Sequence, residues 1–197
     1  MRCSNECLVE IALEDRDLVS QAQKGDRSVQ AAIFERYQMT ALRTAYLILG
    51  DTAEAEDVVQ EAFVRAFRKL STIREPAAFG LWFYKLLTNV ARRHANRNGR
   101  KPQLFANLPD EGQGLVDEQP GPATLAARRA EDEALWKAVR SLDEVHRTTL
   151  VLRYYQDLSL EEIAKIMSCP LGTVKSRLYT TRQRLAKLLV AEDAGVP

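Results

Sequence analysis

The segment Ser159–Leu189 constrains the fold more than any other part of this sequence. Ser159 and Glu162 have the spacing of a capping box, which marks the start of a helix. Pro170 closes a Ser-Cys-Pro run that must end this helix, because proline has no backbone N–H to continue the hydrogen bonds. A second helix is predicted from Thr173, and its expected buried stripe is Val174, Leu178, Leu185 and Leu188. The pattern predicts a helix-turn-helix.

The outer face of the second helix points to DNA. The residues expected at its centre are Ser176, Tyr179, Thr180 and Gln183, flanked by Lys175 and Arg182 on one side and by Arg177 and Arg184 on the other. No acidic residue occurs between Glu162 and Glu192. Such a face suits the major groove, where polar side chains meet base edges and flanking cations meet phosphates. The structural alternative is a solvated helix face, which normally mixes both charge signs.

The charge pattern divides the chain. The net charge is only +1, yet residues 76–103 contain no acid and residues 104–119 contain no base. Two basic regions separated by an acidic connector predict two DNA contacts and weak binding by the free chain. Glycine and proline are concentrated between Gly99 and Thr124, which is typical of a flexible linker. We therefore expect an all-α protein of two small helical domains, at 12–98 and 126–191, joined by a linker at 99–125.

The N-terminal half shows three further helix patterns. One covers Val29–Leu49 and ends at Gly50, and the next starts at Asp51, with Glu54 at capping-box spacing. The exposed side of this second helix begins acidic and ends basic, which either the helix dipole or a docked partner would explain. The third helix, Phe79–Arg97, places four polar residues on one line: Lys85, Asn89, Arg92 and Asn96.

Aromatic residues crowd the start of this third helix, next to its polar line. Phe79 and Trp82 are candidates to stack on unpaired bases, with Trp82 the better placed. Core packing is the competing explanation for these aromatics. His94 falls on the apolar side of the helix and is interpreted as a core histidine rather than a catalyst or ligand.

Several function classes are excluded or disfavoured. The sequence has no phosphate-binding glycine loop, no HExxH and no nucleophile elbow, so we expect neither an enzyme nor a cofactor. No segment is long and apolar enough to span a bilayer, and the N-terminus lacks a signal-peptide pattern, which predicts a cytoplasmic protein. Cys3 and Cys7 favour free thiols over a zinc site, and redox sensing is a hypothesis for them.

Three segments resemble small sigma factors of bacterial RNA polymerase, the extracytoplasmic-function (ECF) type of the sigma-70 family. They are DTAEAEDVVQEAFVRAFRKL from Asp51, FGLWFYKLLTNVARRHANR from Phe79, and SLDEVHRTTLVLRYYQDLSLEEIAKIMSCPLGTVKSRL from Ser141. They occur in the order that the family has, with a linker of the family's kind between them. The resemblance implies a region 2 bundle followed by a region 4 helix-turn-helix.

The resemblance also implies partners and sites. Core RNA polymerase would be bound through the clamp helices of its largest subunit and the flap of the second-largest, and an anti-sigma factor is expected. The docking residues would be Glu54, Asp57, Gln60 and Glu61. The minus-ten element would meet Arg74, Phe79, Trp82, Lys85, Asn89, Arg92, Arg93 and Asn96, with a flipped base held by the loop Ser71–Ala78. The minus-thirty-five element would meet Arg153, Thr173, Lys175, Ser176, Arg177, Tyr179, Thr180 and Arg182.

The sequence departs from the family pattern at three places. Arg93 stands where an acid is common, and the loop segment Ser71–Pro76 differs from the commoner family versions. Asp143 replaces a usual proline, and an S-x-x-E capping box from Ser141 to Glu144 would still begin the helix there.

Two other functions remain open from sequence. A stand-alone helix-turn-helix regulator should dimerise on a palindromic site, but no dimerisation heptads are present. A sigma-like decoy that sequesters an anti-sigma factor would not need both basic faces.

Overall fold

The computed structural model describes residues 15–24, 26–97 and 134–193, and within these ranges the regular structure is entirely helical. The prediction of an all-α protein is confirmed. Cys3, Cys7 and the predicted linker at 99–125 lie outside the described residues. No helix in the described ranges is long and apolar enough to cross a membrane.

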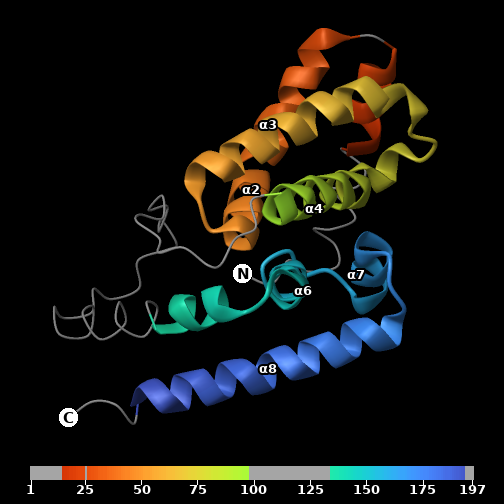
Figure 1. The fold of residues 1–197 in the computed structure, drawn as a ribbon. Coiled ribbons are helices and arrows are strands. Elements are labelled where there is room, and N and C mark those ends of the chain that lie inside the picture. Colours follow the sequence, from red (N-terminus) through yellow and green to blue (C-terminus); the bar gives the residue numbers. More distant parts are fainter. Residues whose placement is uncertain (1–14, 25, 98–133, 194–197) are drawn as a thin grey trace, which may run out of the picture.

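The N-terminal domain is a helical bundle. A first helix covers residues 15–23. It is followed by α2 (Arg27–Leu49), α3 (Thr52–Lys69) and α4 (Phe79–Arg97), with two short 3-10 turns, η1 (Leu70–Thr72) and η2 (Pro76–Ala78), between α3 and α4. Figure 1 shows α2, α3 and α4 packed side by side.

The helix ends follow from local chemistry. Asp26 caps α2 by accepting a hydrogen bond from the Ser28 N–H, and Asp51 caps α3 in the same way from the Glu54 N–H. Gly50 ends α2 in the left-handed region, at φ 84°, where glycine has no steric penalty. The predicted boundary at Gly50 is confirmed.

Aromatic rings fill the core of this bundle. Phe83 stacks on Phe79 at 5.8 Å between ring centroids and contacts Phe63 at 4.7 Å. Tyr37 meets Phe79 edge-on at 5.3 Å. These arrangements are the favourable geometries for aromatic pairs, and they join α2, α3 and α4.

The C-terminal domain contains four helices in the described residues. Residues 134–141 form the first, followed by α6 (Glu144–Tyr154), α7 (Leu160–Met167) and α8 (Leu171–Asp193). Its core is made by buried apolar side chains of α6, α7 and α8, namely Leu152, Ile163, Ile166, Met167, Val174 and Leu178.

The predicted buried stripe of α8 is only partly right. Val174 and Leu178 are buried, whereas Leu188 is 38% exposed. Among residues 171–190 of this helix, none after Thr181 is buried. Thr181 is buried, and its hydroxyl donates a hydrogen bond to the Arg177 carbonyl at 2.7 Å.

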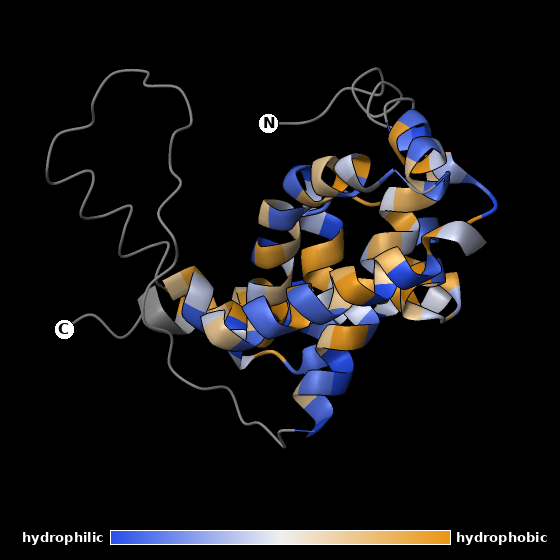
Figure 2. Ribbon diagram, turned by 90° about the horizontal axis from the view of Figure 1, so that it is seen from above, coloured by the Kyte–Doolittle hydropathy of each residue, from blue (hydrophilic) through white to orange (hydrophobic). Residues whose placement is uncertain are grey.

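The two domains pack against each other, which sequence could not predict. Helices α6 and α7 lie against α2 and α4 (Figure 1). Val151 of α6 belongs to the buried cluster of the N-terminal domain, and Leu81 and Tyr84 of α4 pack on the C-terminal one. Figure 2 shows apolar residues gathered where the helices meet.

Candidate nucleic-acid interface

A helix-turn-helix is formed by α7 and α8. The capping box at the start of α7 is complete: the Ser159 N–H donates to Glu162 Oε2 at 2.8 Å, and the Glu162 N–H donates to Ser159 Oγ at 3.2 Å. Ser168 ends α7 in the left-handed region at φ 50°. Pro170 then accepts the Thr173 N–H at 2.9 Å in the first turn of α8. The turn between the two helices is where the sequence predicted it, although α8 begins two residues earlier, at Leu171.

The outer face of α8 is open to solvent. Tyr179 is 67% exposed, and Lys175, Ser176 and Arg182 are exposed as well. Thr173 and Thr180 are half-buried. Polar and cationic groups therefore stand on one free helix face, as base and phosphate contacts require.

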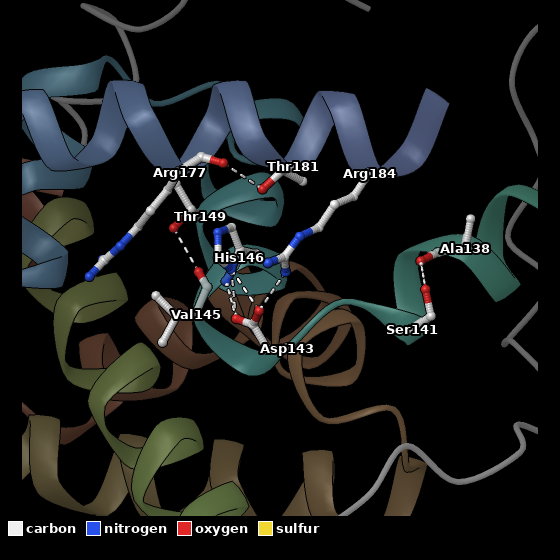
Figure 3. Close-up of polar contacts among 9 residues, drawn as sticks. All are labelled: Ala138, Ser141, Asp143, Val145, His146, Thr149, Arg177, Thr181 and Arg184. Carbon is white, nitrogen blue, oxygen red and sulfur yellow. Dashed lines mark hydrogen bonds and ion pairs between the residues drawn. The ribbon is translucent and has the colours of Figure 1, made fainter. Parts of the chain in front are cut away.

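The two arginines on the other shoulder of α8 contact their own chain. The half-buried Arg177 donates from Nη1 to the Cys169 sulfur at 3.6 Å. Arg184 donates from Nη1 to Asp143 Oδ2 at 2.9 Å (Figure 3). Arg177 keeps its remaining guanidinium donors, so it can still meet a base from the edge of the face.

Tyr154 is a neighbour of the interface that sequence reasoning missed. Its hydroxyl accepts a hydrogen bond from Arg182 Nε at 2.7 Å, and the guanidinium carbon lies 5.7 Å from its ring centroid. This contact orients Arg182 while leaving its Nη donors free. A tyrosine at the end of α6 carries no sequence signal for that position, because the pairing depends on how α6 and α8 pack.

Asp143 fixes the start of α6 beneath α8. It is the N-cap of α6 and accepts a hydrogen bond from the His146 N–H at 3.1 Å, while its carboxylate lies 2.7 Å from His146 Nδ1 (Figure 3). The prediction that Asp143 can begin this helix is confirmed. The capping box predicted from Ser141 is wrong, since the Ser141 hydroxyl donates to the Ala138 carbonyl instead. Asp143 directly precedes α6, so Asp143 rather than Ser141 is its N-cap.

The same contacts determine the acidity of Asp143. Burial raises its pKa, but the hydrogen bonds from His146 and Arg184 outweigh burial and lower the pKa to about 2, from an ordinary 3.8. A group whose folded pKa is depressed stabilises the fold above its unfolded pKa and loses that contribution as pH falls through the folded value.

We therefore expect Asp143→Asn to lower the thermal midpoint at neutral pH, with a difference from wild type that shrinks as pH falls from about 4 to about 2. Thermal denaturation across this pH series measures the difference. Glu161→Gln, at an exposed position on α7, is the control and should show no such convergence. A difference that stays constant through acid would contradict the assignment.

Arg153 is partly committed to the fold. Its Nη1 donates to the Leu158 carbonyl at 2.7 Å and lies 4.0 Å from Asp157 Oδ1, which closes the connection between α6 and α7. Arg153 is half-buried, so a contact with DNA backbone would use its other donors.

The four residues of the predicted polar line lie on α4, but their side chains are not equally exposed. Asn96 is exposed, whereas Lys85, Asn89 and Arg92 are half-buried. Arg93, next to this line, is exposed. Arg92 donates from Nε to Glu144 Oε1 of α6 at 2.8 Å. The helix bounds, Phe79–Arg97, match the prediction.

Two predicted site residues are buried and need correction. Phe79 is 0% exposed and lies in the aromatic core, so it offers no surface for a base. Glu54 is 8% exposed, with Oε2 3.8 Å from His94 Nδ1, so it is poorly placed for docking a partner. His94, predicted as a core histidine, is half-buried rather than fully buried. Trp82 is half-buried beside Phe79, and its accessible part remains the aromatic candidate.

A side chain of the first helix holds the loop between α3 and α4 in place. Gln23 of the first helix donates from its side-chain amide to the Leu70 carbonyl at 3.0 Å and to the Ile73 carbonyl at 2.8 Å. Arg74 follows directly and is exposed. Sequence reasoning missed Gln23, because a glutamine some fifty positions upstream gives no sign of its partners.

The remaining predicted docking residues lie on the outer side of α3. Asp57 and Gln60 are exposed, and Glu61 is half-buried and paired with Arg65 on the next turn. The described residues contain no group of three or more potential metal ligands.

Fold and site together define an all-helical, two-domain DNA-binding protein with a helix-turn-helix in its second domain. Sigma-70 region 2 matches residues 33–101, and Sigma-70 region 4 matches residues 132–185. The chain is 33% identical to the RNA polymerase sigma-H factor of Pseudomonas aeruginosa, over 89% of this chain and 94% of that protein. It is 35% identical to the ECF RNA polymerase sigma-E factor of Escherichia coli K12, over 88% and 93%.

Solved structures show the same fold. CnrH in complex with the cytosolic domain of CnrY matches with a TM-score of 0.66 at 21% identity, covering 90% of this chain and 97% of that one. The sigma factor RpoE of Bartonella quintana, in complex with the anti-sigma factor NepR, matches at 0.63 and 22%, covering 81% and 95%. The chain belongs to the sigma-70 family of RNA polymerase sigma factors, in its ECF group. It is thus a factor for promoter-directed initiation of transcription.

Proposed function

We propose that this protein binds core RNA polymerase, places α8 on the minus-thirty-five element and α4 with the loop Ser71–Ala78 on the minus-ten element, and promotes strand opening there. The observation that carries the proposal is the free outer face of α8, where Lys175, Tyr179 and Arg182 are exposed on a helix-turn-helix. The domain limits that we propose are 12–98 and 126–191.

The two DNA surfaces divide the work. The proposed minus-thirty-five residues are Arg153, Thr173, Lys175, Ser176, Arg177, Tyr179, Thr180 and Arg182. The proposed minus-ten residues are Arg74, Trp82, Lys85, Asn89, Arg92, Arg93 and Asn96. Strand opening does not need a chemical step by this chain. Binding of the unstacked base repays its unstacking cost of a few kcal/mol, so the protein performs no chemistry of its own.

Asp57, Gln60 and Glu61 form the proposed polymerase-docking surface on α3. The exposure of Asp57 and Gln60 supports this assignment. The protein acts in the cytoplasm, where its polymerase is. An anti-sigma factor is the expected inhibitor, and the structure of the sigma factor RpoE in complex with the anti-sigma factor NepR, which this fold matches, supports this.

Run-off transcription with purified core polymerase on a promoter library tests the function. We expect specific initiation with the protein present, and negligible duplex binding by the protein alone at moderate salt in a gel shift. A stand-alone regulator would bind duplex DNA without polymerase. With a decoy, core polymerase would initiate no more transcripts than it does alone. Either result would sink the proposal.

Gln23 is a proposed positioning residue for base capture. We expect Gln23→Ala to lower strand opening by up to about 30-fold, because the loop before Arg74 loses two hydrogen bonds that are each worth about 1 kcal/mol. Permanganate reactivity of the minus-ten thymines in holoenzyme complexes reports opening. The control is Gln21→Ala, at an exposed position on the same helix.

A purely structural role for Gln23 is separable from positioning. A loop defect should leave holoenzyme binding to a template carrying only the minus-thirty-five element unchanged. If Gln23→Ala weakens both measurements equally, Gln23 supports the fold rather than the loop.

A further inference from the structure

The end of α6 and the middle of α8 share a contact between an aromatic side chain and a cation. The two helices lie side by side (Figure 1). Arg182 Nε donates to the Tyr154 hydroxyl, and the guanidinium carbon lies 5.7 Å from the ring centroid, within the range of a cation–π attraction. Tyr154 is 54% exposed, whereas Leu152, two residues earlier, is fully buried. Core packing therefore does not account for the position of Tyr154.

Arg182 keeps its full charge in this contact. Other arginines of the chain are paired with carboxylates: Arg184 with Asp143, and Arg92 with Glu144. Within the described residues, the partner of Arg182 is instead a neutral phenol. A neutral partner orients a cation without cancelling its charge. Arg182 is therefore a fixed cation that can still take up an anion.

Both side chains keep hydrogen-bond donors for that anion. The Arg182–Tyr154 bond uses only Nε of the guanidinium, so the N–H groups of both Nη atoms remain. The Tyr154 oxygen acts as the acceptor in this bond, which leaves its own O–H to donate elsewhere. Phosphate oxygens accept from both kinds of donor, and their bonds to guanidinium are short and strong. The pair thus has the charge and the donors of a phosphate site.

The position of the pair fits the edge of a DNA-reading face. Lys175 lies on the same edge of α8, seven residues before Arg182, or about 10 Å along a helix that rises 1.5 Å per residue. Cations at the edge of a recognition helix contact the DNA backbone, whereas residues at its centre contact base edges. At that spacing, Lys175 and the Tyr154–Arg182 pair reach different phosphates.

We propose that Tyr154 and Arg182 together bind one backbone phosphate of the minus-thirty-five element. Both Nη groups of Arg182 and the O–H of Tyr154 donate to its oxygens. Tyr154 has a second effect as a positioning residue: since it already fixes the guanidinium, less side-chain freedom is lost when the phosphate binds. The site raises affinity without reading sequence. This inference rests on the proposed function.

The test combines Tyr154→Phe, which removes only the hydroxyl, with DNA that lacks single phosphate charges. A promoter chosen by wild-type holoenzyme in run-off transcription is made as a labelled duplex series. Each duplex carries one methylphosphonate, in which a neutral methyl group replaces a charged oxygen, at a different position of the minus-thirty-five element. Fluorescence anisotropy measures holoenzyme affinity for every duplex. We expect Tyr154→Phe to bind unmodified DNA about threefold to tenfold more weakly, since one exposed hydrogen bond is lost.

One modified duplex should abolish this difference, because the phosphate that Tyr154 contacts no longer accepts its hydrogen bond fully. Arg182→Ala should become insensitive to the same modification. Lys175→Ala is the matched comparison on the same helix edge, and it should lose its sensitivity at a different phosphate. At all other positions the ratio between wild type and Tyr154→Phe should stay as on unmodified DNA.

Tyr154→Glu is a second variant that keeps a partner on Arg182 but cancels its charge. We expect weaker binding than with Tyr154→Phe, and a slope of log affinity against log salt that falls by about 1, as for the loss of one phosphate contact. Thermal denaturation verifies that both variants fold.

Two results would overturn the phosphate site. One is a ratio between wild type and Tyr154→Phe that is the same at every modified phosphate, which a purely structural role of the hydroxyl would give. The other is unchanged affinity and salt slope in Tyr154→Glu. If wild-type holoenzyme initiates on no template, the proposed function fails and the site fails with it. Initiation by wild type combined with either of the two results above rejects the site alone.

Discussion

Asp15→Ala is expected to destabilise the N-terminal domain by about 3 kcal/mol, because it removes a buried charge on which two other groups depend. The Asp15 side chain is 5% exposed and lies 3.0 Å from Arg36 Nε through Oδ1. Its other oxygen accepts a hydrogen bond from the Tyr37 hydroxyl. Burial, and then this hydrogen bond, raise the pKa of Tyr37 far above its usual value, so the hydroxyl stays a donor at all ordinary pH.

The cluster of Asp15, Arg36 and Tyr37 also connects the first helix to α4. A Cβ on Gly80 would lie 2.9 Å from the Tyr37 hydroxyl, so α4 approaches the pair closely. Loss of Asp15 should therefore loosen the helix at 15–23 together with its contacts. Urea denaturation followed by circular dichroism gives the free energy of unfolding.

Two variants calibrate that measurement. Asp17→Ala, at an exposed position two residues along the same helix, should change stability by less than about 0.5 kcal/mol. Asp15→Asn keeps an acceptor for Tyr37 but loses the charge that faces Arg36, so its loss should be intermediate. If Asp15→Ala unfolds at the same urea concentration as Asp17→Ala, the cluster contributes nothing.

Local signals predicted the helix boundaries well. Phe79–Arg97 emerged with its predicted limits, and Ser159 with Glu162 formed both halves of the capping box. Gly50 ended α2 as expected. In each case the determining interaction spans four residues or fewer, so sequence spacing contains most of the physics.

Side-chain environment was harder to predict than helix position. Periodicity gave Phe79 a place near the polar line of α4, but it cannot say where the neighbouring helices approach. Phe79 is fully buried, and Tyr37 of α2 lies against its ring. Glu54 failed as a surface residue for a similar reason, because α4 brings His94 over it. Leu188 failed in the opposite sense, since periodicity placed it in the buried stripe of α8 and it is 38% exposed.

Long-range polar pairs were beyond any sequence pattern. Asp15 looked like one of several N-terminal acids, and Gln23 and Tyr154 had no distinguishing neighbours. Their partners lie on other helices or, for Gln23, in the loop between α3 and α4, and they are determined by packing. The Arg92–Glu144 pair even joins two domains, so a side chain predicted for DNA turned out to have a partner within the chain.

Arg177→Ala is expected to lower holoenzyme activity by roughly 1–3 kcal/mol, or about 5- to 150-fold, on some minus-thirty-five sequences and much less on others, as loss of a base contact does. Arg177 is suited to this because it is half-buried at the edge of the α8 face and its link to the Cys169 sulfur, at 3.6 Å, limits where its free donors can point. Initiation rates on a library that varies only the minus-thirty-five element measure the selectivity.

Lys175→Ala is the matched comparison, because Lys175 is an exposed cation two residues away on the same helix. A flexible ammonium contacts phosphate without reading sequence, so all library members should weaken alike, and the slope of log affinity against log salt should fall by about 1. The two cations differ in the structure. Arg177 contacts Cys169 in the turn between α7 and α8, whereas the Lys175 side chain is exposed to solvent. Sequence-blind losses of similar size from both variants would assign Arg177 to phosphate, and recognition would then depend on Ser176, Tyr179 and Thr180 at the centre of the face.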